Sequence, residues 1–93
     1  MLSQLPINLN KINKADLDKE ILRAGMIAEL DAVNFYEQMA VMTENENIRK
    51  VLLDIAREEK THIGEFETLL LGLDQEQVSE NEKAKKEIGD LAG

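Results

Sequence analysis

The sequence predicts an all-α protein, an antiparallel two-helix hairpin that dimerises into a four-helix bundle. Two long segments, about 15–42 and 46–71, contain no proline and repeat apolar residues in steps of three and four, as amphipathic helices do. The turn between them, Thr43 to Asn47, is short enough to force the two helices to run antiparallel. A core built from a chain of 93 residues alone would be marginal, which favours pairing with a second copy.

The amino-terminal segment, Met1 to Asn13, contains the only proline, Pro6, and is expected to be an extended or turn-rich arm. Asn13 or Asp16 is the candidate cap of the helix that follows. No apolar run here is long enough for a signal peptide, and no later run approaches the roughly 20 residues of a membrane-spanning helix. We therefore expect a soluble, cytoplasmic protein.

The first predicted helix carries an apolar row with one acidic interruption. Glu29 occupies a position in this row where Leu or Ile is expected. A carboxylate in an apolar seam is unfavourable unless it is paired or binds a metal. Small residues flank it, and they would permit close approach of another helix. The row is Leu22, Met26, Glu29, Val33, Tyr36 and Ala40.

The second predicted helix starts after a turn with two possible caps. Thr43 with Glu46 matches a capping box, and Asn45 is the alternative cap. Gly72 is the expected stop of this helix. Its apolar row is interrupted by a Glu-x-x-His pair, and it reads Ile48, Leu52, Ile55, Glu59, His62, Phe66, Leu69 and Leu73.

The end of the chain differs in composition from the hairpin. Asp74 to Lys86 is almost entirely polar and charged, so we expect at most a loose helix without a buried face, followed by a frayed end over residues 87–93. We divide the chain into a hairpin domain, residues 1–75, and a charged linker or tail, residues 76–93. A short helix and a docking peptide are the alternatives for the tail.

Charge and cysteine content exclude several classes of function. The net charge of −8 argues against nucleic acid and anionic membrane as partners. The chain has no cysteine, which excludes disulfides, thiolate metal sites and cysteine nucleophiles. Any bound metal must have oxygen and nitrogen ligands.

Hairpin geometry brings the three polar seam residues to one height. If Asn45 is the centre of the turn, Glu29 lies level with position 61, between Glu59 and His62, about 24 Å from the turn. Two carboxylates and an imidazole suit iron, manganese or zinc. Di-iron carboxylate bundles use a Glu from each of two helices and a Glu-x-x-His from each of the other two, so this chain holds half of the set. Two copies would complete a two-metal centre at their interface.

The spacing of Glu29, Tyr36 and Glu59-x-x-His62 over residues 15–75 resembles the encapsulated ferritins, a ferritin-like family. The resemblance implies a ferroxidase that oxidises Fe(II) to Fe(III) at a di-iron site shared by two subunits. It also implies that Glu29, Glu59 and His62 are the iron ligands and that Tyr36 lies close to the iron. It also implies a ring-shaped decamer that delivers iron for storage inside an encapsulin nanocompartment.

Two further features bear on this resemblance. The family carries acidic residues beside its first iron ligand as a cation entry site, and here Asp31 matches such a role whereas Ala28 precedes Glu29. The segment Ile88-Gly89-Asp90-Leu91 is similar to the targeting tail of encapsulin cargo proteins.

Other functions remain open from the sequence. A peroxide-reducing, rubrerythrin-like di-iron protein is a close variant of the ferroxidase. A non-enzymatic helical adaptor, whose polar seam residues fix the pairing register, belongs to a different class.

Overall fold

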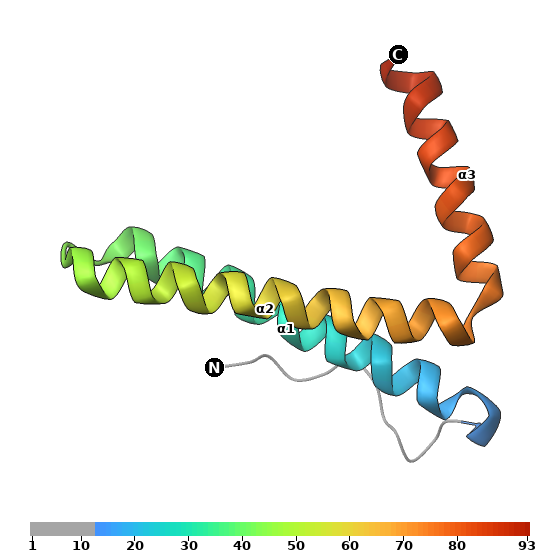
Figure 1. The fold of residues 1–93 in the computed structure, drawn as a ribbon, viewed down its shortest axis with the longest axis horizontal. Coiled ribbons are helices and arrows are strands. Elements are labelled where there is room, and N and C mark those ends of the chain that lie inside the picture. Colours follow the sequence, from blue (N-terminus) through green and yellow to red (C-terminus); the bar gives the residue numbers. More distant parts are fainter. Residues whose placement is uncertain (1–12) are drawn as a thin grey trace.

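The computed structural model describes residues 13–93, which fold as a helical hairpin with a third helix projecting from it (Figure 1). A short 3-10 turn, Lys14–Asp16, precedes α1, Leu17–Met42. A three-residue turn leads to α2, Glu46–Leu73, and α3 is Gln75–Ala92. The hairpin is confirmed, and the described residues contain no strand. The expected amino-terminal arm lies almost entirely outside the described residues.

The hairpin turn is stabilised by two side chains. Asn45 caps α2, because its Oδ1 accepts hydrogen bonds from the backbone N–H groups of Asn47 at 2.9 Å and Ile48 at 3.1 Å. The alternative cap, Thr43 with Glu46, is not the one used. Arg49 closes the other side of the turn by donating to the carbonyl oxygens of Ala40, at 3.0 Å, and Thr43. A residue of α2 thus satisfies one carbonyl in the last turn of α1 and the carbonyl of its C-cap residue.

The core between α1 and α2 is built largely from small residues. None of the described side chains larger than leucine is buried, and alanine supplies most of the buried set: Ala24, Ala32, Val33, Ala40, Leu52, Ala56 and Leu70. The helices approach closely, but the core is thin. Much of the predicted apolar seam is exposed, including Leu69 at 61% and Leu73 at 51%. Apolar surface exposed to this extent is typical of interaction sites.

The end of α2 differs from the prediction. Gly72 is not the stop, because α2 continues to Leu73 and Asp74 is its C-cap residue. Asp74 is buried, with 8% of its surface exposed, and its Oδ2 accepts a hydrogen bond from Arg23 Nη2 of α1 at 2.8 Å. Its Oδ1 accepts from the backbone N–H of Gln77 at 3.1 Å and so caps α3. One buried carboxylate therefore ends one helix and begins the next.

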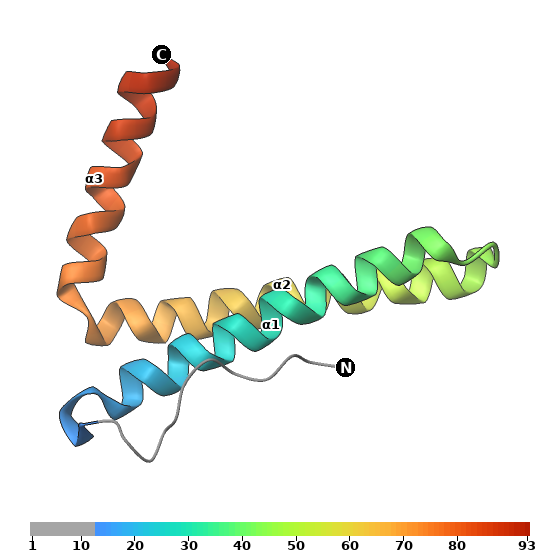
Figure 2. The ribbon, with the colours of Figure 1, turned by 180° about the vertical axis from the view of Figure 1, so that it is seen from behind.

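The tail is one continuous helix rather than a loose helix with a frayed end. Its residues are strong helix formers, and Lys85 pairs with Glu82 one turn earlier at 3.1 Å. As expected, α3 buries none of its residues. Figures 1 and 2 show it leaving the end of α2 steeply, away from the hairpin. The division of the chain near residue 75 remains a prediction. No helix within residues 13–93 is long and apolar enough to cross a membrane.

The close approach of α1 and α2 depends on Gly25, and this can be tested. A Cβ at this position would lie 3.0 Å from Cε2 of Phe66, whereas a Cβ at Gly64 meets nothing within 4 Å. In a helix, alanine is favoured over glycine by about 1 kcal/mol. We expect Gly64→Ala to raise the thermal midpoint and Gly25→Ala to lower it relative to that control. Equal gains, measured by circular dichroism at one protein concentration, would show that Phe66 moves freely.

Asp74 should give the fold a pH dependence at acid pH. The backbone hydrogen bond from Gln77, with the charges of Arg23 and Lys19, lowers the pKa of Asp74 below 3.8, although burial opposes this. A lowered folded-state pKa adds stability that is present above about pH 4 and lost as pH falls through the folded pKa. Asp74→Asn keeps a cap but no charge. We expect the midpoint difference between wild type and this variant, measured from pH 7 to pH 3, to shrink below pH 4. A constant difference would contradict this assignment.

Candidate metal centre

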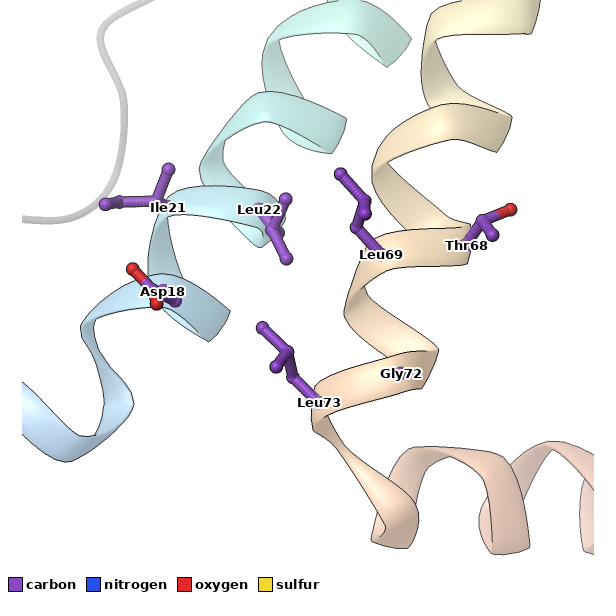
Figure 3. Close-up of a pocket in the computed structure, with 7 residues that line it drawn as sticks. All are labelled: Asp18, Ile21, Leu22, Thr68, Leu69, Gly72 and Leu73. Carbon is purple, nitrogen blue, oxygen red and sulfur yellow. The ribbon is translucent and has the colours of Figure 1, made fainter.

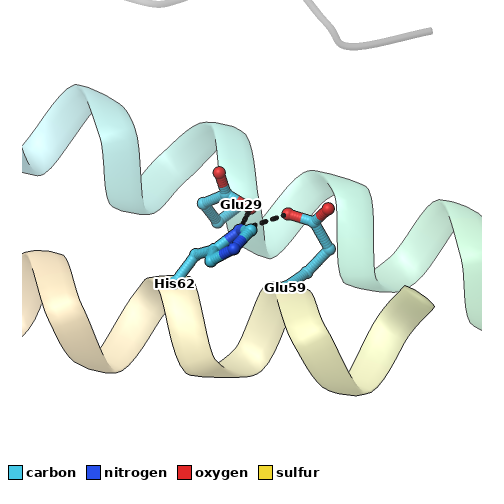
Figure 4. A group of neighbouring side chains, drawn as sticks. All are labelled: Glu29, Glu59 and His62. Carbon is cyan, nitrogen blue, oxygen red and sulfur yellow. Dashed lines mark ion pairs between the residues drawn. The ribbon is translucent and has the colours of Figure 1, made fainter. Parts of the chain in front are cut away.

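The three predicted ligands meet between the two helices of the hairpin. Glu29 comes from α1, and Glu59 and His62 come from consecutive turns of α2 (Figure 4). His62 Nδ1 lies 3.5 Å from Glu29 Oε2 and 3.4 Å from Glu59 Oε2. One potential ligand atom from each residue lies within 4.8 Å of the other two. The three residues therefore lie at the same height along the hairpin, as the sequence predicted from a turn centred on Asn45.

The two carboxylates are more enclosed than the imidazole. The side chains of Glu29 and Glu59 are 21% and 19% exposed, and that of His62 is 46% exposed. Glu29 Oε2 is buried and has no hydrogen-bond partner among the described residues. His62 Nδ1 is in ion-pair range of it, but 3.5 Å exceeds the roughly 2.7–3.2 Å of an N–H···O hydrogen bond. We therefore treat this oxygen as unsatisfied.

An unsatisfied buried carboxylate oxygen fits a metal cation. Burying such an atom without a donor costs about 1–3 kcal/mol, and more for a charged group. A cation bound between Glu29, Glu59 and His62 would remove this cost. Two carboxylate oxygens and one imidazole nitrogen are ligands that iron, manganese and zinc accept. Three ligands leave coordination positions open, and the exposed side of His62 shows where the site opens to the surface.

The two less certain candidates, Tyr36 and Asp31, both belong to α1. Tyr36 is half-buried on α1, two helical turns after Glu29, and its ring packs edge-on against Phe35 with centroids 5.3 Å apart. Asp31 is half-buried on α1 and is not among the three grouped ligands. The roles of Tyr36 and Asp31 at a metal remain predictions.

Sequence reasoning missed two contacts around the site. Lys60 Nζ lies 3.2 Å from Glu37 Oε2 and links α2 to α1 beside Glu59. Opposite charges on facing helices were the available signal. The second contact joins Gly25 of α1 and the ring of Phe66 of α2. Gly25 lies one turn from Glu29, and Phe66 lies one turn from His62. This contact holds the two helices close together next to the site.

Comparison with known proteins identifies the family. The Rubrerythrin family model matches residues 20–90. The crystal structure of the encapsulated ferritin domain from Pyrococcus furiosus superposes with a TM-score of 0.83 at 52% identity, and the match covers 98% of this chain and 93% of that domain. The ferritin-like fold is therefore confirmed.

Two longer proteins are similar in sequence. A ferritin-like-encapsulin shell fusion protein of Pyrococcus furiosus is 54% identical over 96 residues, covering all of this chain and 28% of the relative. The encapsulin nanocompartment cargo protein EncC of Myxococcus xanthus is 34% identical over 74 residues, covering 80% of this chain and 56% of the relative. The chain thus spans only part of each of these relatives. It belongs to the rubrerythrin family and, within it, to the encapsulated ferritins.

Proposed function

We propose that this protein is a ferroxidase, which oxidises Fe(II) to Fe(III) at a site completed by a second copy of the chain. The observation that carries the proposal is the unsatisfied Oε2 of Glu29, buried 3.5 Å from His62 Nδ1 with Glu59 beside it. Membership of a ferritin-like family, whose members bind iron, makes iron the favoured metal. Manganese and zinc suit the same ligands.

A second copy would supply the missing half of the ligand set. One Glu helix and one Glu-x-x-His helix are half of a di-iron bundle, and a two-fold axis beside the site duplicates them. The same pairing would cover exposed apolar residues around His62, such as Leu69 and Leu73. We propose a homodimer as the unit that binds two iron ions, and a ring of such dimers, a decamer, as the larger assembly.

Each residue of the site has a distinct part in this chemistry. Glu29 and Glu59 would hold Fe(II), the substrate, and neutralise its charge, which favours the ferric product. His62 would bind as neutral imidazole. Two Fe(II) lose one electron each, and dioxygen takes both electrons with two protons to leave as hydrogen peroxide. We assign Tyr36 a place near the iron and Asp31 a place on the entry route of cations.

The relatives suggest where the oxidised iron goes. One is named as a fusion to an encapsulin shell and the other as encapsulin nanocompartment cargo. We propose that an encapsulin shell is the partner of this protein, that the protein works inside such a compartment in the cytoplasm, and that the iron is stored there. The last turn of α3, with exposed Ile88 and Leu91, is the candidate contact with the shell.

Iron loading tests the enzyme directly. After anaerobic addition of Fe(II), we expect about one iron per chain, and a rapid ferric absorbance on exposure to air. His62→Ala and Glu59→Gln should lower the rate at least about tenfold, a loss typical even of residues that only support a metal ligand. Glu67→Gln, an exposed carboxylate on the same helix, is the matched control.

The outcomes separate the competing functions. A helical adaptor would bind no iron tightly, and His62→Ala would change only its stability or pairing. A peroxide-reducing protein, favoured by the match to the Rubrerythrin model, would oxidise bound Fe(II) much faster with hydrogen peroxide than with dioxygen.

Metal binding and pairing should be linked, because each copy holds half of the site. We expect Zn²⁺, which is not oxidised, to shift sedimentation toward the dimer, and a chelator to reverse the shift. Sodium chloride at equal ionic strength controls for screening of the carboxylates. Glu29→Gln should abolish the zinc effect. An assembly state that is the same with and without zinc would contradict a shared site.

A further inference from the structure

The ring of Phe66 lies beside the metal group, on the side away from the hairpin turn. Gly25 and Phe66 face each other across the hairpin, since a Cβ on Gly25 would lie 3.0 Å from the ring. Glu29 and His62 face each other four residues nearer the turn on each helix, with Oε2 and Nδ1 3.5 Å apart. Four residues are about one helical turn. The ring and the ligands therefore form successive layers between α1 and α2.

An apolar hollow forms the next layer, farther from the turn. It opens between the first turns of α1 and the last turns of α2, where Figure 3 shows Leu22 and Leu69 extending toward the gap between the helices. Leu22 lies three residues before Gly25, and Leu69 lies three residues after Phe66. The hollow reaches the surface, since Leu69 is 61% exposed. The ring of Phe66 thus lies between this hollow and the ligands.

The directions of two side chains bring the ring toward the Glu29 carboxylate. A side chain on an α-helix leans toward the turn that precedes it in the sequence. On α1 this directs Glu29 toward Gly25, and on α2 it directs Phe66 toward His62. Because the two helices are antiparallel, Glu29 and Phe66 lean toward each other over Gly25. The space that a side chain at position 25 would fill is taken by the ring.

We infer that Phe66 keeps water away from Glu29 Oε2, and that Gly25 provides the room for its ring. The inference rests on the proposed function, because it concerns the site that would bind Fe(II). A phenyl ring has no hydrogen-bonding N–H or O–H group. A ring in this place accounts for a buried Oε2 that has no partner among the described residues. Phe66 is thus a positioning residue, which excludes solvent and does not bind the metal.

A carboxylate shielded from water discriminates among divalent cations. Mg²⁺ gives up its water reluctantly and usually keeps several water molecules in protein sites. Iron, manganese and zinc bind directly to imidazole and carboxylate ligands. An apolar ring beside Glu29 leaves no place there for the water that Mg²⁺ keeps. The Phe66 ring therefore makes the site reject Mg²⁺ and accept Fe(II) or Zn²⁺.

Metal discrimination tests this role without iron oxidation. The affinity for Zn²⁺ is measured with a competing chelator, with and without excess Mg²⁺. We expect Phe66→Ala to lower the ratio of Zn²⁺ to Mg²⁺ affinity at least about tenfold, as is typical of residues that support a metal ligand. Phe66→Leu keeps an apolar wall and should retain most of the ratio. Water-proton relaxation of bound Mn²⁺ reports the water on the metal directly, and Phe66→Ala should increase it.

Gly25→Ala repeats the test from the opposite helix. Its methyl group would displace the ring, so the Zn²⁺ to Mg²⁺ ratio and the Mn²⁺ relaxation should change in the same direction as in Phe66→Ala. Adding Phe66→Leu to Gly25→Ala removes ring atoms from the crowded place and should restore most of the ratio. Gly64→Ala is the matched control, because Gly64 lies two residues from His62 and its Cβ would meet nothing within 4 Å.

Each outcome decides the inference. An unchanged ratio and unchanged Mn²⁺ relaxation in Phe66→Ala and Gly25→Ala would overturn it. Equal losses of Zn²⁺ and Mg²⁺ affinity would also overturn it, since they indicate a purely structural role. If circular dichroism shows that Phe66→Ala is unfolded, Gly25→Ala and its double variant decide the same question.

Iron oxidation by the wild-type chain is read separately. A changed ratio in the variants without iron oxidation by the wild type would keep the role of Phe66 and overturn the ferroxidase. Iron oxidation with an unchanged ratio would overturn the role of Phe66 alone. A wild-type chain that binds no Zn²⁺ would overturn both.

Discussion

The structure depends on one unfavourable burial, that of the Glu29 carboxylate inside an apolar hairpin. Its Oε2 has no hydrogen-bond partner among the described residues, and His62 Nδ1 lies 3.5 Å from it. Burying such an oxygen is unfavourable unless a donor or a cation lies beside it. Glu59 lies next to Glu29 in this group. Two neighbouring carboxylates repel each other, so a bound cation would be favourable between them. A cation bound here would therefore also stabilise the hairpin.

Close helix approach explains both the grouping of Glu29, Glu59 and His62 and the thin core of the hairpin. Alanines, together with Gly25 under the ring of Phe66, hold α1 and α2 near enough for ligands from both helices to meet. The same small residues bury little apolar surface, and larger side chains remain exposed on the faces of the hairpin. A second copy would supply the missing core and the missing ligands through one interface.

The sequence predicted the hairpin and the grouping of Glu29, Glu59 and His62, because both follow from helical periodicity. A seam that is apolar except at Glu29, Glu59 and His62 identifies those residues, and the short turn fixes their heights. The end of α2 was not predictable in this way, because Asp74 prevails over Gly72 through an arginine 51 residues earlier in the chain. The continuous α3 was missed for a related reason: its helix has no apolar face, so periodicity carried no signal.

Asp74 and Glu29 are both acidic side chains of low exposure, but their hydrogen-bond partners differ. Asp74, like Glu29, lies against the opposite helix of the hairpin, but Arg23 and a backbone N–H satisfy both of its oxygens. The chain has eleven lysine and arginine residues, so a shortage of basic residues does not explain the lack of a donor at Glu29. An arginine facing Glu29 would satisfy the carboxylate and block a metal. The contrast supports the view that Asp74 is a structural residue that orients α3. It also supports the proposal that the unsatisfied oxygen of Glu29 binds a cation.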